Sequence, residues 1–301
     1  MALIRYPGSK AKLATEIISR FPVEMQLALW KSVSGWEYRE PFFGSGAIGF
    51  EVLLELPRSS RIWINDADAW LVNLWLSVRD HRNALCERIQ SFQPSVEAFY
   101  QFKEQDGTEC HSVVDSGFKK LALHQMSVSG FGAMSGGPLG GRDQRNAAYP
   151  VHCRWNPSRL AGHTIRLNRT LTRFDSCKIT CGDFEPILVD APRECFIYLD
   201  PPYVEKGAQL YKYNMTRADH VRLADLVKSL RCPWVMSYDD TPFIRRLYSW
   251  ACIDEIFVTY TNAIVKTNRR PKNKEIVITP SSSFLDDARS SDNVYCELRM
   301  T

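Results

Sequence analysis

An apolar run followed by two prolines constrains this chain most. Cys195-Phe196-Ile197-Tyr198-Leu199 has strand length and predicts a strand of a parallel sheet, buried on both faces. Asp200-Pro201-Pro202-Tyr203 follows directly, at the carboxyl end of the strand, where α/β sheets bind ligands. Because the prolines have no backbone N–H, this corner offers a carboxylate, carbonyl oxygens and an aromatic ring.

Such a corner suits an amino group on a flat ring, for example that of adenine. Two acceptors that hold both amine hydrogens would draw the nitrogen lone pair out of conjugation and aim it at an electrophile. We expect Asp200 and the Pro201 carbonyl to be these acceptors and Tyr203 to stack on the base. The alternative is a Pro-Pro turn that only ends a strand, and four residues alone do not decide between the two.

Composition predicts a soluble, cytoplasmic globular protein. The chain has 301 residues, of which 45% are hydrophobic and 12% aromatic, enough for one large domain or a domain with an insertion. No segment approaches the length of a membrane span, and residues 1–10 lack a signal-peptide apolar region. The nine cysteines include no C-x-x-C pair, so we expect reduced, mostly buried thiols and no metal site.

Strand and helix signals alternate in two blocks, which predicts an α/β sheet domain interrupted by an insertion. Residues 1–91 and 176–301 form the predicted sheet domain, and residues 92–175 form a mostly helical module. Expected strands lie near residues 38–43, 61–65, 178–181, 195–199, 234–237, 253–260 and 275–279. Expected helices lie near residues 11–21, from 69 onward, 219–230 with Thr216 as cap, and 242–248.

Polar groups follow the other predicted strands as well. Gly44-Ser45-Gly46 gives a tight turn at a helix start, where a backbone can approach a ligand. Asp66 ends the next strand, at the spacing of a carboxylate that holds ribose hydroxyls. Asp183-Phe184 offers a polar group and a ring for an adenine. The third glycine of the dinucleotide fingerprint is missing, which favours a smaller nucleoside ligand.

Basic residues gather within the predicted insertion. Between residues 142 and 178 there are eight basic and two acidic side chains, so this segment has a net charge of +6; the whole chain has +4, and the remainder therefore has −2. Asn156-Pro157 predicts a helix start, and leucines at helical spacing predict its buried face. Arg159, Arg166 and Arg173 are seven residues apart and predict a surface that contacts DNA phosphates. The alternative is a solvated helix face.

The glycine cluster from Gly130 to Gly141 has two interpretations. A flexible surface loop is the favoured one, because loops of this length are often mobile. The other is a segment that becomes ordered over a ligand.

Together these motifs resemble the Dam-type class of S-adenosylmethionine-dependent DNA adenine methyltransferases. Asp200 to Tyr203 matches the catalytic tetrapeptide of that family. The other similar segments, in the family order, are Tyr6 to Lys10, Pro41 to Ala47, Asn65-Asp66, Gly182 to Phe184, Asp219-His220, Ser237 to Pro242 and Lys274 to Ile278. Ser9 departs from the pattern, since a second glycine is more usual there. The glycine-rich stretch also departs, and we carry no role over to the insertion.

The resemblance implies a Rossmann-like methyltransferase sheet with an inserted target-recognition module. It implies S-adenosylmethionine as methyl donor, without a metal, and extrusion of the target adenine from double-stranded DNA. The implied catalytic residues are Asp200, Pro201, Pro202 and Tyr203. The implied cofactor residues are Tyr6, Lys10, Gly44, Ser45, Gly46, Asp66, Asp183, Phe184 and Asp200.

Three alternatives stay open at this point. The same chemistry could act on RNA adenine, because RNA bases also splay out. Methylation of a cytosine amine is the second, although related enzymes more often have serine in place of Asp200. A catalytically silent DNA-binding subunit with the same fold is the third. Target sequence, oligomeric state and biological role, whether restriction-linked, phage-borne or regulatory, cannot be read from the chain.

Overall fold

A seven-stranded sheet forms the centre of the structure. The computed structural model describes residues 3–5, 9–21, 35–108, 112–205, 207, 212–259 and 272–281. The strand order is β3-β2-β1-β4-β5-β7-β6; the first five strands are parallel and β7 is antiparallel to both of its neighbours. The strands are β1 (Glu37–Glu40), β2 (Arg61–Asp66), β3 (Ser176–Cys181), β4 (Cys195–Leu199), β5 (Trp234–Asp239), β6 (Cys252–Thr259) and β7 (Lys272–Thr279).

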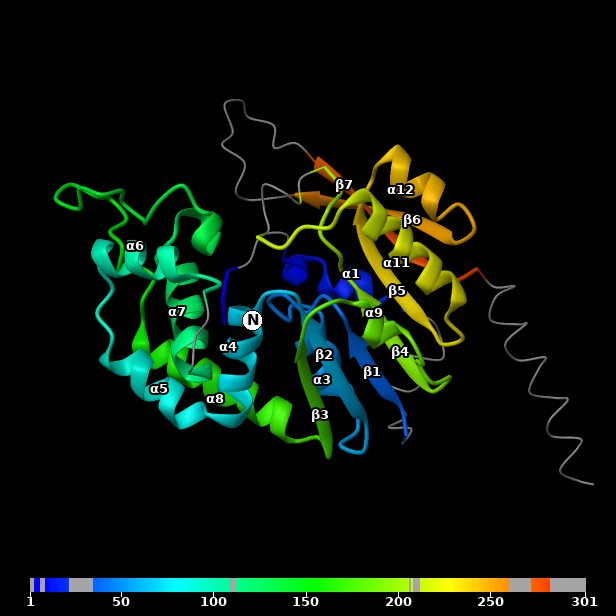
Figure 1. Cartoon of the computed structure of the whole chain (residues 1–301), viewed down its shortest axis with the longest axis horizontal. Helices are drawn as coiled ribbons and strands as arrows, with labels where there is room; N and C mark the ends of the chain where they lie inside the picture. The colour runs from blue at the N-terminus through cyan, green and yellow to red at the C-terminus, as the bar shows by residue number, and fades with distance from the viewer. Residues whose placement is uncertain are drawn as a thin grey trace, which may run out of the picture.

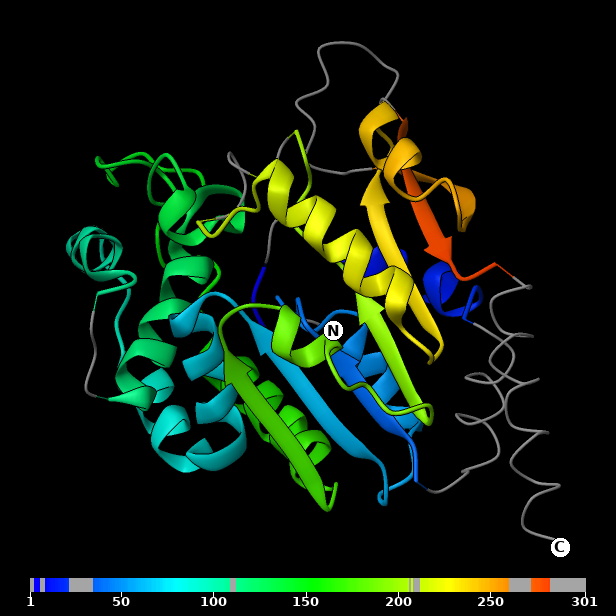
Figure 2. The same ribbon diagram turned by 45° about the vertical axis from the view of Figure 1, so that its right-hand side comes forward.

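Helices lie on both sides of this sheet and form a separate group beside it. Figures 1 and 2 show α5 to α8 gathered at one side of the sheet, next to α4. The described helices are α1 (Ala14–Ile18), α3 (Gly49–Glu55), α4 (Ala69–Asp80), α5 (Arg82–Ser91), α6 (Val96–Gln105), α7 (Val113–Met126), α8 (Pro157–Thr172), α9 (Glu185–Leu188), α11 (Arg217–Ser229) and α12 (Pro242–Leu247). Short 3₁₀ turns cover Lys10–Lys12, Val128–Gly130 and Gly132–Met134.

The two faces of the sheet contribute side chains to two separate hydrophobic cores, because side chains alternate along a strand. On β4, Phe196 and Tyr198 join the core that contains α3, α4, α7 and α8, whereas Ile197 and Leu199 join the core beneath α9, α11 and α12. All five residues of β4 are buried, as the apolar run predicts. Asp200 therefore follows a strand that is fixed from both sides.

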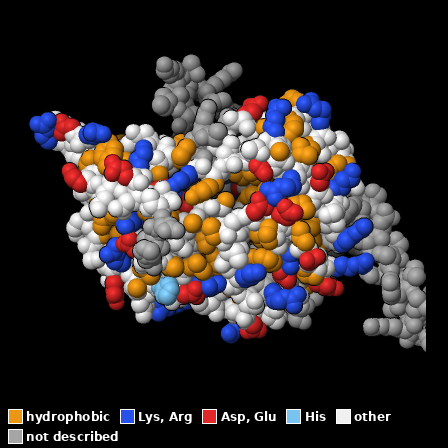
Figure 3. Space-filling view, in the orientation of Figure 1, with side chains coloured by type: hydrophobic (Ala, Val, Ile, Leu, Met, Phe, Trp, Pro, Cys, Tyr) orange, Lys and Arg blue, Asp and Glu red, His pale blue; other side chains and the backbone are white. Residues whose placement is uncertain are grey.

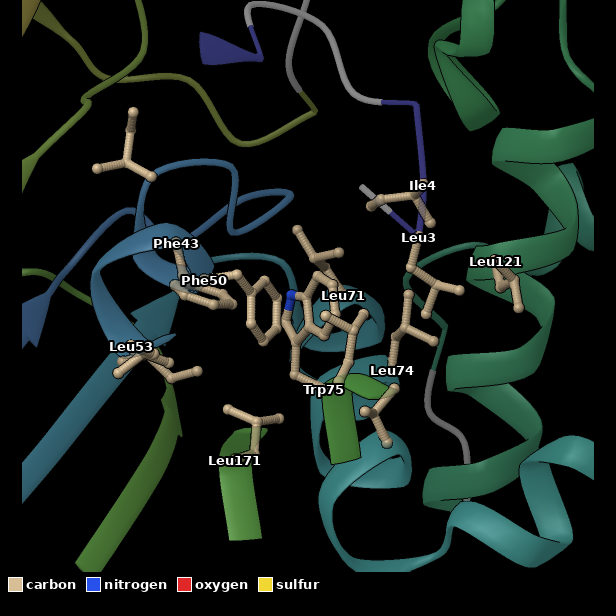
Figure 4. Close-up of a cluster of buried hydrophobic side chains, with 14 of the residues drawn as sticks. Leu3, Ile4, Phe43, Phe50, Leu53, Leu71, Leu74, Trp75, Leu121 and Leu171 are labelled. Carbon is tan, nitrogen blue, oxygen red and sulfur yellow. The ribbon is translucent and has the colours of Figure 1, made fainter. Parts of the chain in front are cut away.

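Trp75 of α4 ties the first core to the glycine turn after β1 (Figure 4). Its ring lies 5.5 Å from the Phe43 ring and 5.3 Å from the Phe50 ring, centre to centre. The buried indole N–H donates to the Gly44 carbonyl over 3.0 Å. Buried indole nitrogens generally find such a partner. A core residue therefore sets the position of the predicted cofactor turn.

The inserted helices share the core of the sheet domain. Phe118 and Leu121 of α7 belong to the same cluster as Ile62 and Ile64 of β2. α7 lies close against α4, and at Gly117 an added Cβ would come within 2.7 Å of a backbone oxygen on α4. α5, on the sheet-domain side of the predicted boundary, packs against α7 and α8. The boundaries at residues 91 and 175 stay a prediction.

Most expected elements agree with the structure to within a few residues. Thr216 caps α11 with a full capping box, and Asn156 caps α8, whose first residue is Pro157. The single helix expected over residues 11–21 is wrong. A 3₁₀ turn covers Lys10–Lys12, and α1 begins only at Ala14. Lys10 is buried and forms an ion pair with Asp200, a contact that helical periodicity does not reveal.

The glycine-rich stretch forms a loop with internal hydrogen bonds, and its flexibility and its ordering over a ligand both stay predictions. His124 Nδ1 lies 2.8 Å from the Gly130 carbonyl, and the Gly132 N–H donates to Ser127 Oγ over 2.9 Å. Gly130 has φ +77°, and an added Cβ would lie 2.5 Å from Arg5 Cβ. The loop therefore needs glycine at this position for close packing, as well as for its turn.

The expectation of mostly buried cysteines is also wrong for the described residues. Cys195 and Cys232 are buried, whereas Cys153, Cys181 and Cys252 are exposed. Cys181 is exposed because it ends β3, which is an edge strand with neighbours on one side only. No helix among the described residues has both the length and the apolar composition needed to cross a bilayer. Within the same part of the chain, no group of three His, Cys, Asp or Glu side chains is arranged around a common metal position.

Candidate active site

A cavity lies at the carboxyl ends of β1, β2, β3 and β4. The empty space in and in front of it is about 1050 Å³, open solvent included. Figure 3 shows the corresponding face hollowed between the helical group and the sheet. Predicted residues that line it are Lys10, Gly44, Ser45, Asp66, Asp183, Phe184, Asp200 and Pro202. The carboxyl ends of four strands thus bring together residues from both halves of the chain, from Lys10 to Pro202.

Asp66 holds the glycine turn as well as facing the cavity. One of its carboxylate oxygens accepts from the Gly44 N–H over 2.8 Å, and the other accepts from the Asp68 N–H over 2.9 Å. Burial raises the pKa of Asp66 to about 6, although these two N–H groups oppose the shift. A cation or a hydroxyl donor bound in the cavity would favour the ionised form of this carboxyl group.

Gly46 supports the turn from behind. It does not line the cavity, and its φ of +67° is one that side chains rarely adopt. An added Cβ would lie 2.6 Å from the Phe50 ring. Gly46 therefore allows the turn to pack on α3, whereas Gly44 and Ser45 line the cavity. Tyr6, the remaining predicted cofactor residue, lies outside the described residues.

Glu40 is a cavity residue that the sequence analysis missed. It ends β1 and is 2% exposed, and its carboxylate accepts from the Tyr38 hydroxyl over 2.7 Å. Burial raises the pKa of Glu40 well above its ordinary value; Tyr38 opposes this, and Asp200 and Asp66 add to it by repulsion. Glu40, Asp66 and Asp200 are three of the six carboxyl groups that line the cavity, and the repulsion of Glu40 by the other two favours a positively charged ligand. The sequence contains a signal for it, since Glu40 directly precedes the Pro41 to Ala47 motif.

The catalytic corner is held by a buried lysine and a serine. Lys10 is 1% exposed, and its ammonium lies 2.7 Å from Asp200 Oδ1. Ser237 Oγ donates to the same oxygen over 2.8 Å, and the Tyr198 hydroxyl lies 2.9 Å from Ser237 Oγ. Two donors on Oδ1 fix the carboxylate and direct its other oxygen to other partners.

The charges of this corner depend on one another. Burial raises the pKa of Asp200, and Lys10 and Ser237 restrain that rise. Burial alone would lower the pKa of Lys10, but Asp200, Tyr203 and Glu275 raise it well above its ordinary value. The lysine therefore carries its charge at neutral pH, which favours an ionised Asp200.

The structure does not present Tyr203 as an exposed ring on which a base could stack. It is 6% exposed, and it is not among the residues that line the cavity. Its hydroxyl donates to Glu275 Oε1 over 2.7 Å, and the Lys10 ammonium lies 4.9 Å from its ring centre. The base-stacking role of Tyr203 stays a prediction, as does the carbonyl role of Pro201. Pro202, by contrast, faces the cavity.

Asp183 and Phe184 shape the mouth of the cavity together with Arg222. Both Asp183 oxygens accept from the Arg222 guanidinium, over 2.9 and 2.7 Å, which lowers the pKa of Asp183. The guanidinium carbon lies 4.4 Å from the Phe184 ring centre, and the centre of the Phe42 ring lies 5.5 Å from the same point. Phe184 is thus a fixed apolar wall, whereas the Asp183 carboxylate is committed to an ion pair.

The comparisons with known proteins agree with this geometry. The family model of the D12 class N6 adenine-specific DNA methyltransferases matches residues 6–262. The chain belongs to this family. The chain is therefore an adenine-specific DNA methyltransferase, in which the cavity and the Asp200 corner lie within the matched range.

Two curated relatives of this methyltransferase are type II methyltransferases. M1.LlaDCHI of Lactococcus lactis subsp. cremoris is 26% identical over 253 residues, which cover 80% of this chain and 84% of the relative. M.MjaIII of Methanocaldococcus jannaschii is 23% identical over 246 residues, covering 75% and 79%. A solved precorrin 8W decarboxylase from Methanobacterium thermoautotrophicum aligns at 10% identity, covering 87% of this chain and 94% of its own, with a TM-score of 0.33 that carries no argument.

The predicted DNA contacts of the methyltransferase lie away from the cavity: Arg159 and Arg166 are on α8, and Arg173 follows its last residue. Arg159 and Arg166 are exposed and form no ion pair with a described residue. Arg173 is different, because its guanidinium donates to the Leu56 carbonyl and packs on the Phe174 ring at 4.8 Å. No α8 residue lines the cavity, and α8 ends just before β3 begins, at the amino edge of the sheet (Figure 1). The three arginines therefore do not form one free stripe.

Proposed function

We propose that this DNA adenine methyltransferase binds S-adenosylmethionine in the cavity at the carboxyl ends of the strands. The mix of polar and aromatic residues that line the cavity suits a nucleoside with an amino-acid tail. Gly44 and Ser45 supply close backbone, Asp66 an acceptor for ribose hydroxyls, and Phe184 an apolar wall for the adenine. The observation that most directly supports a cationic ligand is the buried Glu40 carboxyl group, which Asp66 and Asp200 repel. The positive sulfonium of the cofactor would offset this repulsion.

The Asp200 corner is the proposed site of the target amine. When bound, the cofactor supplies a sulfonium methyl group that is already activated for transfer. The residues of the chain then have to orient the amine and exclude water. Lys10 and Ser237 hold Asp200 Oδ1, so the carboxylate meets an incoming amine in one fixed orientation. Pro202 lines the cavity beside it and closes the apolar side of the corner.

The target adenine reaches this corner by extrusion from double-stranded DNA. Inside a duplex the amine is engaged in a base pair, and taking the nucleotide out of the stack costs a few kcal/mol. The exposed Arg159 and Arg166, together with the basic residues of the 142–154 loop, are the proposed phosphate-contacting groups of the insertion. The two type II methyltransferase relatives support methylation at a specific site.

Isotope-labelled cofactor tests this proposal directly. The protein is incubated with labelled S-adenosylmethionine and either duplex DNA or RNA, and the digested nucleosides are analysed by mass spectrometry. Label on the exocyclic amine of deoxyadenosine is the expected result. The variant Asp200→Ala should lose transfer, because a transition-state acceptor is gone. Its melting temperature should also fall, because the buried Lys10 ammonium loses its nearest carboxylate, so transfer is measured at a temperature at which the variant is folded. Residual turnover above about a tenth of the wild-type rate would contradict the role of Asp200.

A further inference from the structure

Glu275 is a buried carboxylate that no part of the proposed mechanism uses. It lies on β7, is 2% exposed and does not line the cavity. Burying a carboxylate is costly unless it is paired, so its partners indicate its purpose. These partners belong to the catalytic corner. The Tyr203 hydroxyl donates to Oε1 over 2.7 Å, and the Lys10 ammonium lies 3.9 Å from Oε2.

These contacts close a ring around the catalytic tetrapeptide. Lys10 lies between two carboxylates, at 2.7 Å from Asp200 and 3.9 Å from Glu275, and 4.9 Å from the Tyr203 ring centre. Asp200 and Tyr203 are the two ends of the tetrapeptide, and the prolines between them have restricted φ angles. A segment that is held at both ends and stiff between them has one orientation. Glu275 supplies the hold at the Tyr203 end.

We propose that Glu275 is a positioning residue for methyl transfer. Through the Tyr203 hydroxyl and the Lys10 ammonium it fixes the tetrapeptide, and so fixes the direction from which Asp200 meets the target amine. Misplacement of a catalytic group by about 1 Å can cost about 10²-fold in rate. This role rests on the proposed function of the Asp200 corner, and it predicts an effect on the transfer step rather than on cofactor binding.

Tyr203→Phe is the informative variant, because it keeps the ring and removes only the hydroxyl. Single-turnover transfer to an adenine-containing duplex is measured for Tyr203→Phe, Glu275→Ala, Glu275→Gln and the Tyr203→Phe/Glu275→Ala double variant. Each of the first two should slow transfer, by up to about 10²-fold. The double variant should be no slower than the slower single variant, since both remove the same hydrogen bond. Glu275→Gln should recover part of the rate, because its amide oxygen still accepts the hydroxyl.

Two further measurements separate positioning from a purely structural role. Calorimetry should give wild-type affinity for S-adenosylmethionine in every variant, because Glu275 and Tyr203 do not line the cavity. The matched control is Glu255→Ala on neighbouring β6, whose carboxylate pairs with Arg245 and Lys274 near the surface. This variant should transfer at the wild-type rate, since exposed ion pairs contribute little.

Several outcomes would overturn the proposal. Transfer by Tyr203→Phe at the wild-type rate would do so. A double variant whose fold-loss of rate equals the product of the two single losses would do so as well. A lowered melting temperature with unchanged transfer would make Glu275 a structural residue only. If Glu275→Ala fails to fold, Tyr203→Phe and Glu275→Gln decide the question, together with their double variant. A wild-type protein without any transfer would instead refute the function on which the inference rests.

Discussion

Asp66 makes the stability of the protein depend on pH in a direction opposite to that of most carboxylates. Its pKa is about 6 in the folded protein, against an ordinary value of 3.8. Between these values the folded state binds more protons than the unfolded state, so stability falls as pH rises through this window. The shift corresponds to at most about 3 kcal/mol at about 1.36 kcal/mol per pKa unit, less what water in the cavity screens.

The variant Asp66→Asn cannot ionise and should remove this dependence. Its amide also points an N–H toward one of the two backbone donors at Gly44 and Asp68, a cost that does not change with pH. Urea unfolding followed by fluorescence of the eight tryptophans gives the free energy of unfolding at about pH 4 and about pH 7. We expect the wild type to lose up to about 3 kcal/mol relative to the variant between these pH values.

The comparison needs a control variant, and one result would refute the reasoning. Other titrating groups are shared by both proteins and cancel in the difference, apart from Glu40, whose raised pKa depends in part on repulsion by Asp66. Asp183→Asn serves as control, because the pKa of Asp183 is lowered by Arg222, so its contribution has the opposite sign. That contribution should stay within about 1 kcal/mol, since the pair is partly exposed. If wild type and Asp66→Asn differ in their free energy of unfolding by the same amount at both pH values, the raised pKa is refuted.

Three other predictions concern the frame around the site. Replacing Arg159 and Arg166 by glutamine should weaken binding to any duplex and reduce the salt slope of affinity by about 0.9 for each phosphate that is no longer neutralised; an unchanged slope would leave a solvated helix face. Gly46→Ala should lower the free energy of unfolding by about 1–3 kcal/mol or more, through the clash with Phe50, and a thermal melt at the wild-type midpoint would contradict this. Thr216→Ala should cost about 1 kcal/mol in urea unfolding, and a smaller loss than a few tenths would mean that the capping box is not needed.

The sequence predicts what depends on local pattern. Asp66 and Asp200 can be placed at strand ends because a run of apolar residues has a visible end, and both line one cavity. The Tyr203 contact with Glu275 spans 72 residues, and no periodicity connects the two positions. Arg173 matches the spacing of a phosphate-binding stripe, but the spacing cannot reveal that α8 ends before it and that Leu56 accepts its hydrogen bond.

For Asp183, the sequence predicts the position of the side chain but not its partner. Its position after β3 follows from the sequence, whereas its ion pair with Arg222 depends on how α11 crosses the sheet. Glu40 is within reach of sequence reasoning, because it directly precedes the Pro41 to Ala47 motif. Its importance comes from burial beside two other carboxyl groups, which only the packing of β1 between β2 and β4 creates. Long-range packing, rather than residue type, is what a sequence does not reveal.

The corner around Asp200 is assembled from segments that lie far apart in the chain, and this affects when the protein can act. Lys10 precedes β1 in the chain, and Glu275 comes from β7, which is inserted between β5 and β6. A nascent chain still without β7 has its glycine turn and the Asp200 segment, yet lacks the strand that closes the ring. Full transfer activity should therefore begin only after β7 has left the ribosome and joined the sheet. For the same reason, a break between α12 and β7 should give two inert fragments that recover transfer when mixed.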